Sequence, residues 1–262
     1  MRLGMKLGWQ WNSGAAFGTL LAFSLLLGGC TGAESPISSE APLDAPVTTA
    51  TLPSAEEMTV GLARLEGEAT VEIKVGNDII TVELDGNRAP VTAGNFVDLA
   101  QKGVYDGTIF HRVVTSPEPF VAQGGDPQST DPSVSVNQLG SGGYIEDGRE
   151  RTIPLEILPV GADEPVYGQT FPEAGVTAKP ELDHKRGAIA MARSGVNTAS
   201  SQFYITLADV AFLDGNYAVF GYVTDGMDAV DDIQIGDVIT SVTVTSGSDN
   251  LVIPEVDEDE AE

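Results

Sequence analysis

Short runs in which apolar and polar residues alternate predict β-strands over most of the chain. The stretch ATVEIKVGNDIITVEL, residues 69–84, contains two such runs joined by Gly76-Asn77-Asp78, a typical hairpin signal. Because side chains alternate between the two faces of a strand, Val71, Ile73 and Val75 are expected on one face of a sheet. Six further strands are predicted at GTIFHRVV, PFVAQGG, RGAIAMAR, SQFYITL, YAVFGYV and VITSVTV.

The period of the pattern changes at APVTAGNFVDLAQKG, residues 89–103. Apolar residues there recur at the spacing of one helical face, at positions Ala93, Phe96, Val97 and Ala100. Pro90 suits the first turn of a helix and Gly103 suits its end. The pattern therefore predicts a helix over residues 90–102.

A second, shorter helix is predicted within GMDAVDDIQIG, with Asp225 as its N-cap and Gly236 as its stop. Many short strands, two helices and long connections rich in Gly and Pro predict a mainly β fold, a closed barrel with helices over its ends. Residues 128–183 are weakly patterned. They are either an active-site loop system or an elaborated surface, and long loops in a compact domain favour the first.

The N-terminus has the pattern of a secretory signal. Arg2 and Lys6 are the only charged residues among the first 29, and the apolar run AAFGTLLAFSLLLGG follows at residues 15–29. This run is too short for an ordinary membrane span but suits the apolar part of a signal peptide. It leads into LGGC, which resembles the lipobox of bacterial lipoproteins, whose cysteine is lipidated and becomes the new N-terminus. Cys30 is the only cysteine, and the alternative is a plain signal peptide with Cys30 incidental.

These patterns divide the chain into four parts. We predict a signal peptide at 1–29, a lipidated Cys30 with a flexible tether over 30–57, a folded domain over 58–248 and an acidic C-terminal tail over 249–262. The tether is predicted because its residues are mostly Ser, Thr, Pro, Ala and Glu, which cannot bury enough apolar surface to become ordered. The predicted location is extracytoplasmic, with the protein held to a membrane by its lipid.

The net charge of the chain limits the kinds of molecule that it is expected to bind. Thirteen Lys and Arg against 39 Asp and Glu give a formal charge of −26 over 262 residues. Such a surface argues against binding of nucleic acid or of acidic ligands, because both require a basic footprint. Strong negative charge also disfavours close self-association, so a monomer is expected.

Conventional catalytic groups are sparse. The two histidines, His111 and His184, lie far apart in the sequence, and with one cysteine neither a metal centre nor another cofactor is expected. The serines of MARSGVNTASSQF stand outside a G-x-S-x-G elbow, and no phosphate-binding glycine loop opens a βα unit. A Ser-His-Asp triad assembled from distant positions is disfavoured, because His111 lies in a strand signal.

Three segments, FHRVV…FVAQGGD, GAIAMARSGVNTASSQFYIT and FLDGNYAVFGYV, together resemble the cyclophilin family of peptidyl-prolyl isomerases, in the family's order and at nearly its spacing. The resemblance extends from about Ala69 to Val244. It implies a closed antiparallel eight-stranded β-barrel capped by two α-helices, and rotation of X-Pro peptide bonds as the activity. It implies proline-containing polypeptides as substrates, without a cofactor.

The resemblance also implies roles for individual residues. Arg112 matches the catalytic arginine. The matching substrate-binding positions are Phe120, Val121, Gln123, Ala192, Arg193, Gln202, Tyr204, Phe212, Leu213 and Tyr217. Several depart from the usual family residue, notably Val121 for methionine, Tyr204 for phenylalanine and Phe212 for tryptophan. Three extra residues within TSPEP are expected to enlarge a loop before Phe120 without moving the strands.

Arginine suits this reaction because its guanidinium is always charged and presents fixed donors. Rotation about a peptide bond has a barrier of about 18–20 kcal/mol, and in the twisted state the nitrogen lone pair can accept a hydrogen bond. A guanidinium against that nitrogen would stabilise the twisted amide more than either planar form. For Arg112 the alternative is a structural ion pair with a carboxylate.

The leading prediction is therefore an isomerase that assists folding of exported proteins. The alternative from another class is a catalytically weak, cyclophilin-like module that binds or scaffolds proline peptides, and the substitutions around the pocket motivate it. A general chaperone that uses the acidic surface or the long loops is a third possibility.

Overall fold

The computed structural model describes residues 53–254 of the chain. The predicted signal peptide, Cys30 and residues 31–52 of the predicted tether lie outside the described residues. So do residues 255–262 of the predicted acidic tail.

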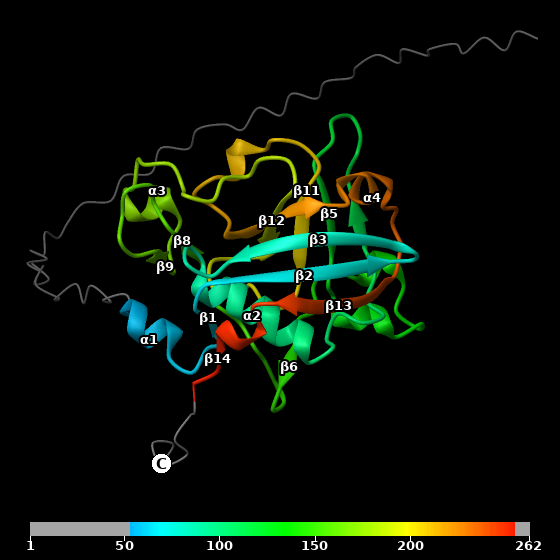
Figure 1. The fold of residues 1–262 in the computed structure, drawn as a ribbon, viewed down its shortest axis with the longest axis horizontal. Helices are drawn as coiled ribbons and strands as arrows, with labels where there is room; N and C mark the ends of the chain where they lie inside the picture. Colours follow the sequence, from blue (N-terminus) through cyan, green and yellow to red (C-terminus); the bar gives the residue numbers. More distant parts are fainter. Residues whose placement is uncertain (1–52, 255–262) are drawn as a thin grey trace, which may run out of the picture. The chain divides into compact units, whose positions relative to one another are not determined.

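An eight-stranded antiparallel sheet forms the centre of the described chain (Figure 1). Its strands occur in the spatial order β13-β2-β3-β12-β10-β11-β5-β4. Their bounds are β2 Glu68–Val75, β3 Asp78–Asp85, β4 Arg112–Val113, β5 Val121–Gly124, β10 Ala188–Met191, β11 Phe203–Thr206, β12 Val219–Asp225 and β13 Ile239–Ser246. The number and direction of the strands agree with the prediction.

The two ends of this sheet, β4 and β13, meet through irregular backbone rather than through a strand ladder. Ile109 and Val238 form an isolated antiparallel bridge, and the Phe110 N–H donates to the Asp237 carbonyl at 2.9 Å. Of the predicted strand GTIFHRVV, only Arg112–Val113 near its C-terminal end forms a strand, β4. The sheet is a curled half-barrel, so the prediction of a closed barrel holds for its curvature and strand number but not for a continuous ladder.

Both predicted helices are present, and α2 (Pro90–Gln101) agrees with its prediction at both ends. Pro90 occupies the first turn, and Gly103 follows the helix with φ 68°. The helix α4 (Met227–Asp232) begins differently, because its N-cap is Gly226 at φ 83° and the predicted Asp225 cap is wrong. A Cβ at this glycine would lie 2.3 Å from the Ile79 carbonyl oxygen, so the close approach of β3 requires glycine here.

The prediction of two α-helices is incomplete, because the described chain contains two more and four 3₁₀ turns. These are α1 Ala55–Thr59, α3 Phe171–Ala174, η1 Pro127–Thr130, η2 Val136–Gln138, η3 Ala211–Leu213 and η4 Ser248–Asn250. Three short strand pairs accompany them: β1 Arg64–Leu65 with β14 Leu251–Val252, β6 Ile145–Glu146 with β7 Arg149–Glu150, and β8 Glu156–Ile157 with β9 Val166–Tyr167. Helix α1 and strand β14 extend the ordered part beyond 58–248 at both ends.

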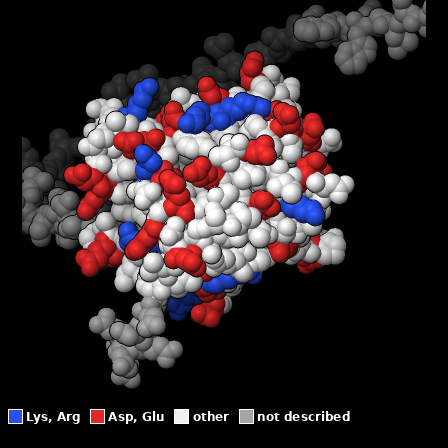
Figure 2. Space-filling model, viewed as in Figure 1, with Lys and Arg blue, Asp and Glu red and all other residues white. Residues whose placement is uncertain are grey.

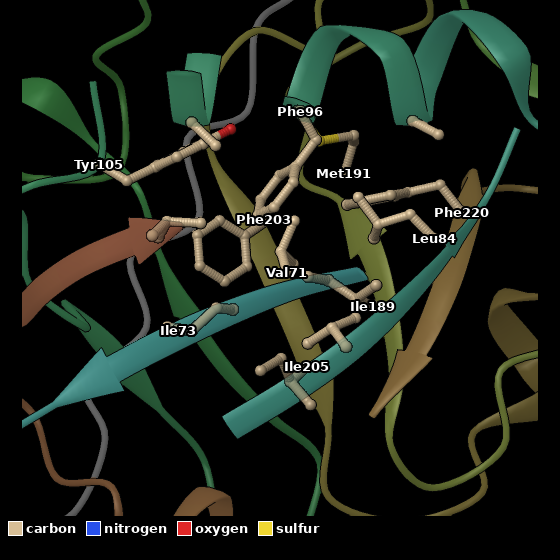
Figure 3. Packing of buried hydrophobic residues seen from close by; sticks show 14 of the residues in the cluster. Val71, Ile73, Leu84, Phe96, Tyr105, Ile189, Met191, Phe203, Ile205 and Phe220 are labelled. Atoms are coloured by element: carbon tan, nitrogen blue, oxygen red, sulfur yellow. The ribbon is translucent and has the colours of Figure 1, made fainter. Parts of the chain in front are cut away.

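The core lies between the inner face of the sheet and α2 (Figure 3). Val71 and Ile73 of β2 are fully buried there, as their alternation predicts, whereas Val75 is only partly buried. Phe96 of α2 points into this layer, and its ring centroid lies 5.3 Å from that of Phe203 and 5.2 Å from that of Phe220. These aromatic rings fix the distance between the helix and the strands that carry the cavity described below.

The N-terminus of α2 is capped by a residue from far along the chain. Its own N-cap, Ala89, has no side-chain oxygen to accept from the free N–H groups of the first turn. Glu156 of β8 accepts instead from the backbone N–H of Val91 at 3.1 Å and of Thr92 at 2.8 Å. The Thr92 and Tyr167 hydroxyls each donate to the same carboxylate at 2.7 Å, so this buried carboxylate has four donors.

Asp and Glu side chains are scattered over the face of the molecule seen in Figure 2, with uncharged surface between them. On this face the negative charge is spread out rather than gathered in one patch. Within residues 53–254, no His, Cys, Asp and Glu side chains come together as a metal site would require.

Candidate active site

A cavity of about 590 Å³ opens beside β4, β5 and β11. Every predicted catalytic and substrate-binding residue except Phe212 lines it. These lining residues are Arg112, Phe120, Val121, Gln123, Ala192, Arg193, Gln202, Tyr204, Leu213 and Tyr217. The predicted residues come from separate parts of the sequence, and the fold brings them to one surface.

The register of three neighbouring strands explains how the central side chains meet. Arg112 of β4 pairs with Gln123 of β5, and Gln123 pairs in turn with Tyr204 of β11. Directly paired residues on neighbouring antiparallel strands point to the same face of a sheet. These three side chains therefore form one row across the sheet face that carries the cavity.

The extra residues within TSPEP do not disturb this register. The Phe120 N–H donates to the Val114 carbonyl at 2.8 Å, and the Val114 N–H donates to the Val121 carbonyl at 2.9 Å. These bonds close the loop that contains the extra residues, so it projects beyond the paired part of β4 and β5. The prediction that the loop grows without shifting the strands is confirmed.

A chain of hydrogen bonds runs along the polar side of the cavity. Arg112 Nη1 donates to Gln123 Oε1 at 3.2 Å, and Gln123 Nε2 donates to Gln202 Oε1 at 3.1 Å. Gln202 Nε2 donates to the Gly142 carbonyl at 2.7 Å. This chain holds both glutamine amides in a fixed orientation and sets the direction of the Arg112 guanidinium.

The guanidinium of Arg112 also lies over the ring of Phe120, with 5.5 Å from Cζ to the ring centroid. The ion pairs found within residues 53–254 use other basic side chains, so no carboxylate neutralises Arg112. Only one of its five N–H donors has a partner in the described chain. The remaining donors are available to a ligand in the cavity.

The other side of the cavity is apolar. Val121, Ala190 and Tyr204 belong to one buried cluster, against which Leu213 and Tyr217 pack. Such a surface can receive an apolar ring and exclude water from it. The cavity therefore places a cation with free donors beside an apolar wall.

Phe212 lies at the rim rather than in the cavity. It is 71% exposed, and its ring stacks on that of Phe120 with 5.7 Å between centroids. The predicted rim position agrees with this placement, although Phe212 does not line the cavity. Because Phe120 does line it, the Phe212 ring reaches the cavity through one intervening ring.

Arg193 is held differently from Arg112. Its Nη2 donates to the Asn216 carbonyl, and its guanidinium lies over the Tyr217 ring with 4.5 Å from Cζ to the centroid. Arg193 thus ties the strand side of the cavity to the segment that follows η3.

Part of the cavity lining was not predicted from the sequence. The missed residues are Gly140, Ser141, Gly142, Glu150, Thr152, Ser194, Thr198 and Ser200. Those between 140 and 152 belong to the weakly patterned region, for which an active-site loop was one of the two interpretations. Asp126 holds this loop in place, because its Oδ2 accepts from the N–H of Gly140 at 2.7 Å and of Gly142 at 3.1 Å.

His184 and Asp214 are two further residues next to the site that the sequence did not indicate. The Tyr204 hydroxyl lies 2.9 Å from His184 Nε2, and His184 Nδ1 lies 2.9 Å from Asp214 Oδ1. The extra hydroxyl of Tyr204 therefore has a buried partner. Burial raises the pKa of Tyr204 well above its usual value, so the hydroxyl stays protonated.

Comparison with known proteins agrees with this fold and cavity. The family model described as "Cyclophilin type peptidyl-prolyl cis-trans isomerase/CLD" matches residues 70–253. A crystal structure of a cyclophilin type peptidyl-prolyl cis-trans isomerase from Cryptosporidium parvum aligns with a TM-score of 0.50 and 26% identity, covering 68% of this chain and 98% of that one.

Curated relatives point to the same family. A Synechocystis sp. protein, named as a thylakoid lumen peptidyl-prolyl cis-trans isomerase, is 40% identical over 75% of this chain and 52% of its own length. A chloroplastic peptidyl-prolyl cis-trans isomerase of Arabidopsis thaliana is 38% identical over 72% of this chain and 45% of its own length. A peptidyl-prolyl cis-trans isomerase of Helicobacter pylori is 36% identical over 68% of this chain and 86% of its own length.

The curled eight-stranded antiparallel sheet of the described chain is a cyclophilin-like fold. The chain belongs to the cyclophilin-type peptidyl-prolyl cis-trans isomerase family. It spans about half the length of the Synechocystis and Arabidopsis relatives.

Proposed function

We propose that the protein is an active peptidyl-prolyl cis-trans isomerase whose substrates are proline-containing polypeptides. The observation that carries this proposal is the row of Arg112, Gln123 and Tyr204 beside an apolar wall, with an Arg112 guanidinium that no carboxylate of residues 53–254 pairs. A cation in this setting can donate hydrogen bonds to a ligand without giving up a proton.

In the proposed reaction, the apolar side of the cavity, including Val121 and Leu213, holds the proline ring. Gln123 holds the substrate backbone through its amide, which is already oriented by Gln202. Arg112 then donates to the prolyl nitrogen when the X-Pro bond is twisted and that nitrogen has a free lone pair. This hydrogen bond stabilises the twisted form more than either planar form, and the difference lowers the barrier to rotation about the X-Pro bond.

The direct test is a tetrapeptide assay of cis–trans exchange. Uncatalysed exchange takes about 10–100 s at 25 °C, so catalysis is read as a faster approach to equilibrium. We expect the purified chain to accelerate exchange in a proline peptide and to leave other steps of the assay unchanged. The absence of acceleration by a folded protein would contradict the proposal.

The second candidate function is a module that binds proline peptides without useful turnover. Val121 favours it, because it is shorter than the methionine usual in the family and would grip a proline ring less firmly. Calorimetric binding of the same tetrapeptides, without acceleration of exchange, would identify this function instead.

Phe212→Trp gives an optical test of the proposed binding surface. The chain's two tryptophans lie at positions 9 and 11, within the predicted signal peptide, so the processed protein would have no other indole. Because Phe212 is exposed and stacks on Phe120, we expect the emission of the new indole to shift when a proline peptide binds. Ile235→Trp, at a residue that is 56% exposed and outside the cavity lining, is the matched control and should not respond. An unchanged emission of the Phe212→Trp variant with a peptide that calorimetry shows to bind would refute this placement.

We further propose that the protein works outside the cytoplasm as a monomer, held to a membrane by a lipid on Cys30. The LGGC sequence after a signal-like segment supports this, as do the lumenal and chloroplastic names of two relatives. No helix within residues 53–254 has the length and apolarity needed to span a membrane. In this proposal residues 1–29 are removed, residues 31 to about 54 are the tether, and exported proteins are the folding clients.

Cys30→Ser tests the anchor. We expect this variant to move from the membrane fraction to the soluble fraction after cell lysis, because a serine cannot carry the lipid. Ser35→Ala, five residues further on, is the control and should stay with the membrane. Membrane attachment that survives Cys30→Ser would rule out lipidation at this residue.

A further inference from the structure

The Tyr204 side chain presents its ring to the cavity and its hydroxyl to the interior. Tyr204 lines the cavity, whereas His184 does not, and the His184 side chain has no exposed surface. The hydroxyl lies 2.9 Å from His184 Nε2, and no other hydrogen-bond partner of this hydroxyl occurs within residues 53–254. The Tyr204 ring therefore gives the cavity an aromatic surface, and the polar hydroxyl of this tyrosine faces away from the cavity.

The contacts of His184 determine where its proton lies. A carboxylate only accepts hydrogen bonds, so Nδ1, which lies 2.9 Å from Asp214 Oδ1, must carry a hydrogen and donate it. In the neutral ring the other nitrogen, Nε2, then has a lone pair and accepts from the Tyr204 hydroxyl. The direction of the whole chain follows: the tyrosine donates to the histidine, and the histidine donates to the aspartate.

The same residues also hold the segment that carries Leu213 into the cavity lining. The His184 N–H donates to Asp214 Oδ1 at 2.8 Å, and the Val210 N–H donates to the His184 carbonyl at 2.8 Å. Residues 210 and 214 flank η3, which carries Leu213 into the cavity lining. One buried histidine thus connects β11, through Tyr204, to the η3 segment.

We propose that His184 and Asp214 are positioning residues of the proline site: they hold the Tyr204 hydroxyl away from the cavity, and protonation of His184 reverses this hydrogen bond and weakens the binding of proline peptides. The inference rests on the proposed function, because the cavity concerned is the one assigned to proline. It adds a dependence of activity on pH, which the proposed mechanism of Arg112 does not itself contain.

Protonation reverses the bond between the two rings. A charged imidazole donates from both nitrogens, so Nε2 can no longer accept from the Tyr204 hydroxyl. The hydroxyl oxygen then accepts from the Nε2–H instead, and the hydroxyl hydrogen loses its only acceptor within residues 53–254. An apolar wall thereby gains an unpaired polar hydrogen, which disfavours contact with a proline ring.

The groups around His184 set the direction of its titration. Burial lowers the pKa of His184 below its usual 6.5, while the carboxylates of Asp214 and Asp183 oppose this effect. The neighbouring Lys185 ammonium lies over the Tyr222 ring, 4.0 Å from its centroid, and the Tyr222 hydroxyl donates to the Asp183 carbonyl. The neutral ring is therefore the form present at neutral pH, and the change occurs as pH falls below the usual histidine range.

The experiment measures kcat/KM of the full chain for a proline tetrapeptide at pH 8 and pH 5, and compares the ratio of the two values among variants. We expect the wild-type value to fall by about fivefold or more at pH 5, as suits the loss of the only acceptor for a buried hydroxyl hydrogen. Tyr204→Phe removes the hydroxyl and His184→Gln removes the titrating ring, so each should give a nearly constant ratio, whatever its activity at pH 8. His111→Gln is the matched control because it alters the only other histidine, and it should keep the wild-type ratio.

An NMR measurement tests the arrangement without using activity. The ¹⁵N chemical shifts of the His184 ring at pH 8 should identify the neutral tautomer, in which Nδ1 is protonated and Nε2 is not. A ring with hydrogen on Nε2 would overturn the proposal, as would a pH-dependent ratio that survives Tyr204→Phe or disappears in His111→Gln. If the chain binds tetrapeptides without isomerising them, the proposed isomerase activity is wrong but the His184 proposal can still be tested. In that case the ratio compared among variants is that of the peptide binding constants at pH 8 and pH 5. If His184→Gln does not fold, Tyr204→Phe and the NMR shifts decide the outcome.

Discussion

Replacing Arg112 with alanine is expected to reduce kcat/KM for a proline tetrapeptide about 100- to 1,000-fold, the effect of deleting one preorganised donor to a transition state. The loss should fall on kcat more than on KM, because the proposed bond to the prolyl nitrogen exists only while the amide is twisted. The fold should be unaffected, since Arg112 is exposed and its one hydrogen bond goes to Gln123.

Two further variants separate the role of the guanidinium from that of its charge. Arg112→Lys keeps the cation but loses the planar set of donors, so we expect an activity between those of wild type and Arg112→Ala. Arg149→Ala removes the same charge from an exposed residue of β7 outside the cavity lining, and should leave kcat/KM nearly unchanged. If Arg112→Ala retains more than about a tenth of the activity while its circular dichroism is unchanged, the electrostatic mechanism is wrong.

The site could be predicted from the sequence to the extent that its residues lie in short, strongly patterned segments. Arg112, Gln123 and Tyr204 fall on strands whose alternation is visible, and the pairing register then places them in one row. Their assignment came from resemblance to a family, because no local pattern distinguishes a cavity-lining glutamine from any other polar strand residue.

What could not be predicted are contacts between residues far apart in sequence. Tyr204 stands where the family usually has phenylalanine, but nothing in the spacing indicated that His184 and Asp214 would hold its hydroxyl. The start of α4 was misplaced for a similar reason. Gly226 is required there by the backbone of β3, which lies far from it along the chain.

The weakly patterned region 128–183 was predicted to be either an active-site loop system or an elaborated surface, and the first interpretation holds for part of it. Gly140, Ser141, Gly142, Glu150 and Thr152 line the cavity, and Asp126 holds the start of this loop by two backbone hydrogen bonds. The following part, which contains β8 and β9, instead supplies Glu156 to the N-terminus of α2. A local cap signal was absent because Ala89 cannot provide one, and the replacement, Glu156, comes from near the middle of this region.

Glu156→Ala is accordingly expected to lower the free energy of unfolding by about 3–4 kcal/mol, a large effect for one substitution. Alanine would leave two backbone N–H groups of α2 and the hydroxyls of Thr92 and Tyr167 without their acceptor in a buried site. Burial raises the pKa of Glu156, and these four donors oppose that rise by favouring the carboxylate. Urea denaturation followed by circular dichroism measures the change.

Glu173 provides the matched control, because it also caps a helix but does so locally and at the surface. It accepts from the Thr170 N–H and hydroxyl at the start of α3, each at 2.8 Å, and Glu173→Gln should cost about 1 kcal/mol or less. Tyr167→Phe removes only one of the four donors to Glu156, so its cost should lie between the two. A Glu156→Ala protein no less stable than Glu173→Gln would show that water satisfies the first turn of α2. In that case β8 and β9 would be surface elaboration, and the orientation of α2 against Phe203 and Phe220 would depend on aromatic packing alone.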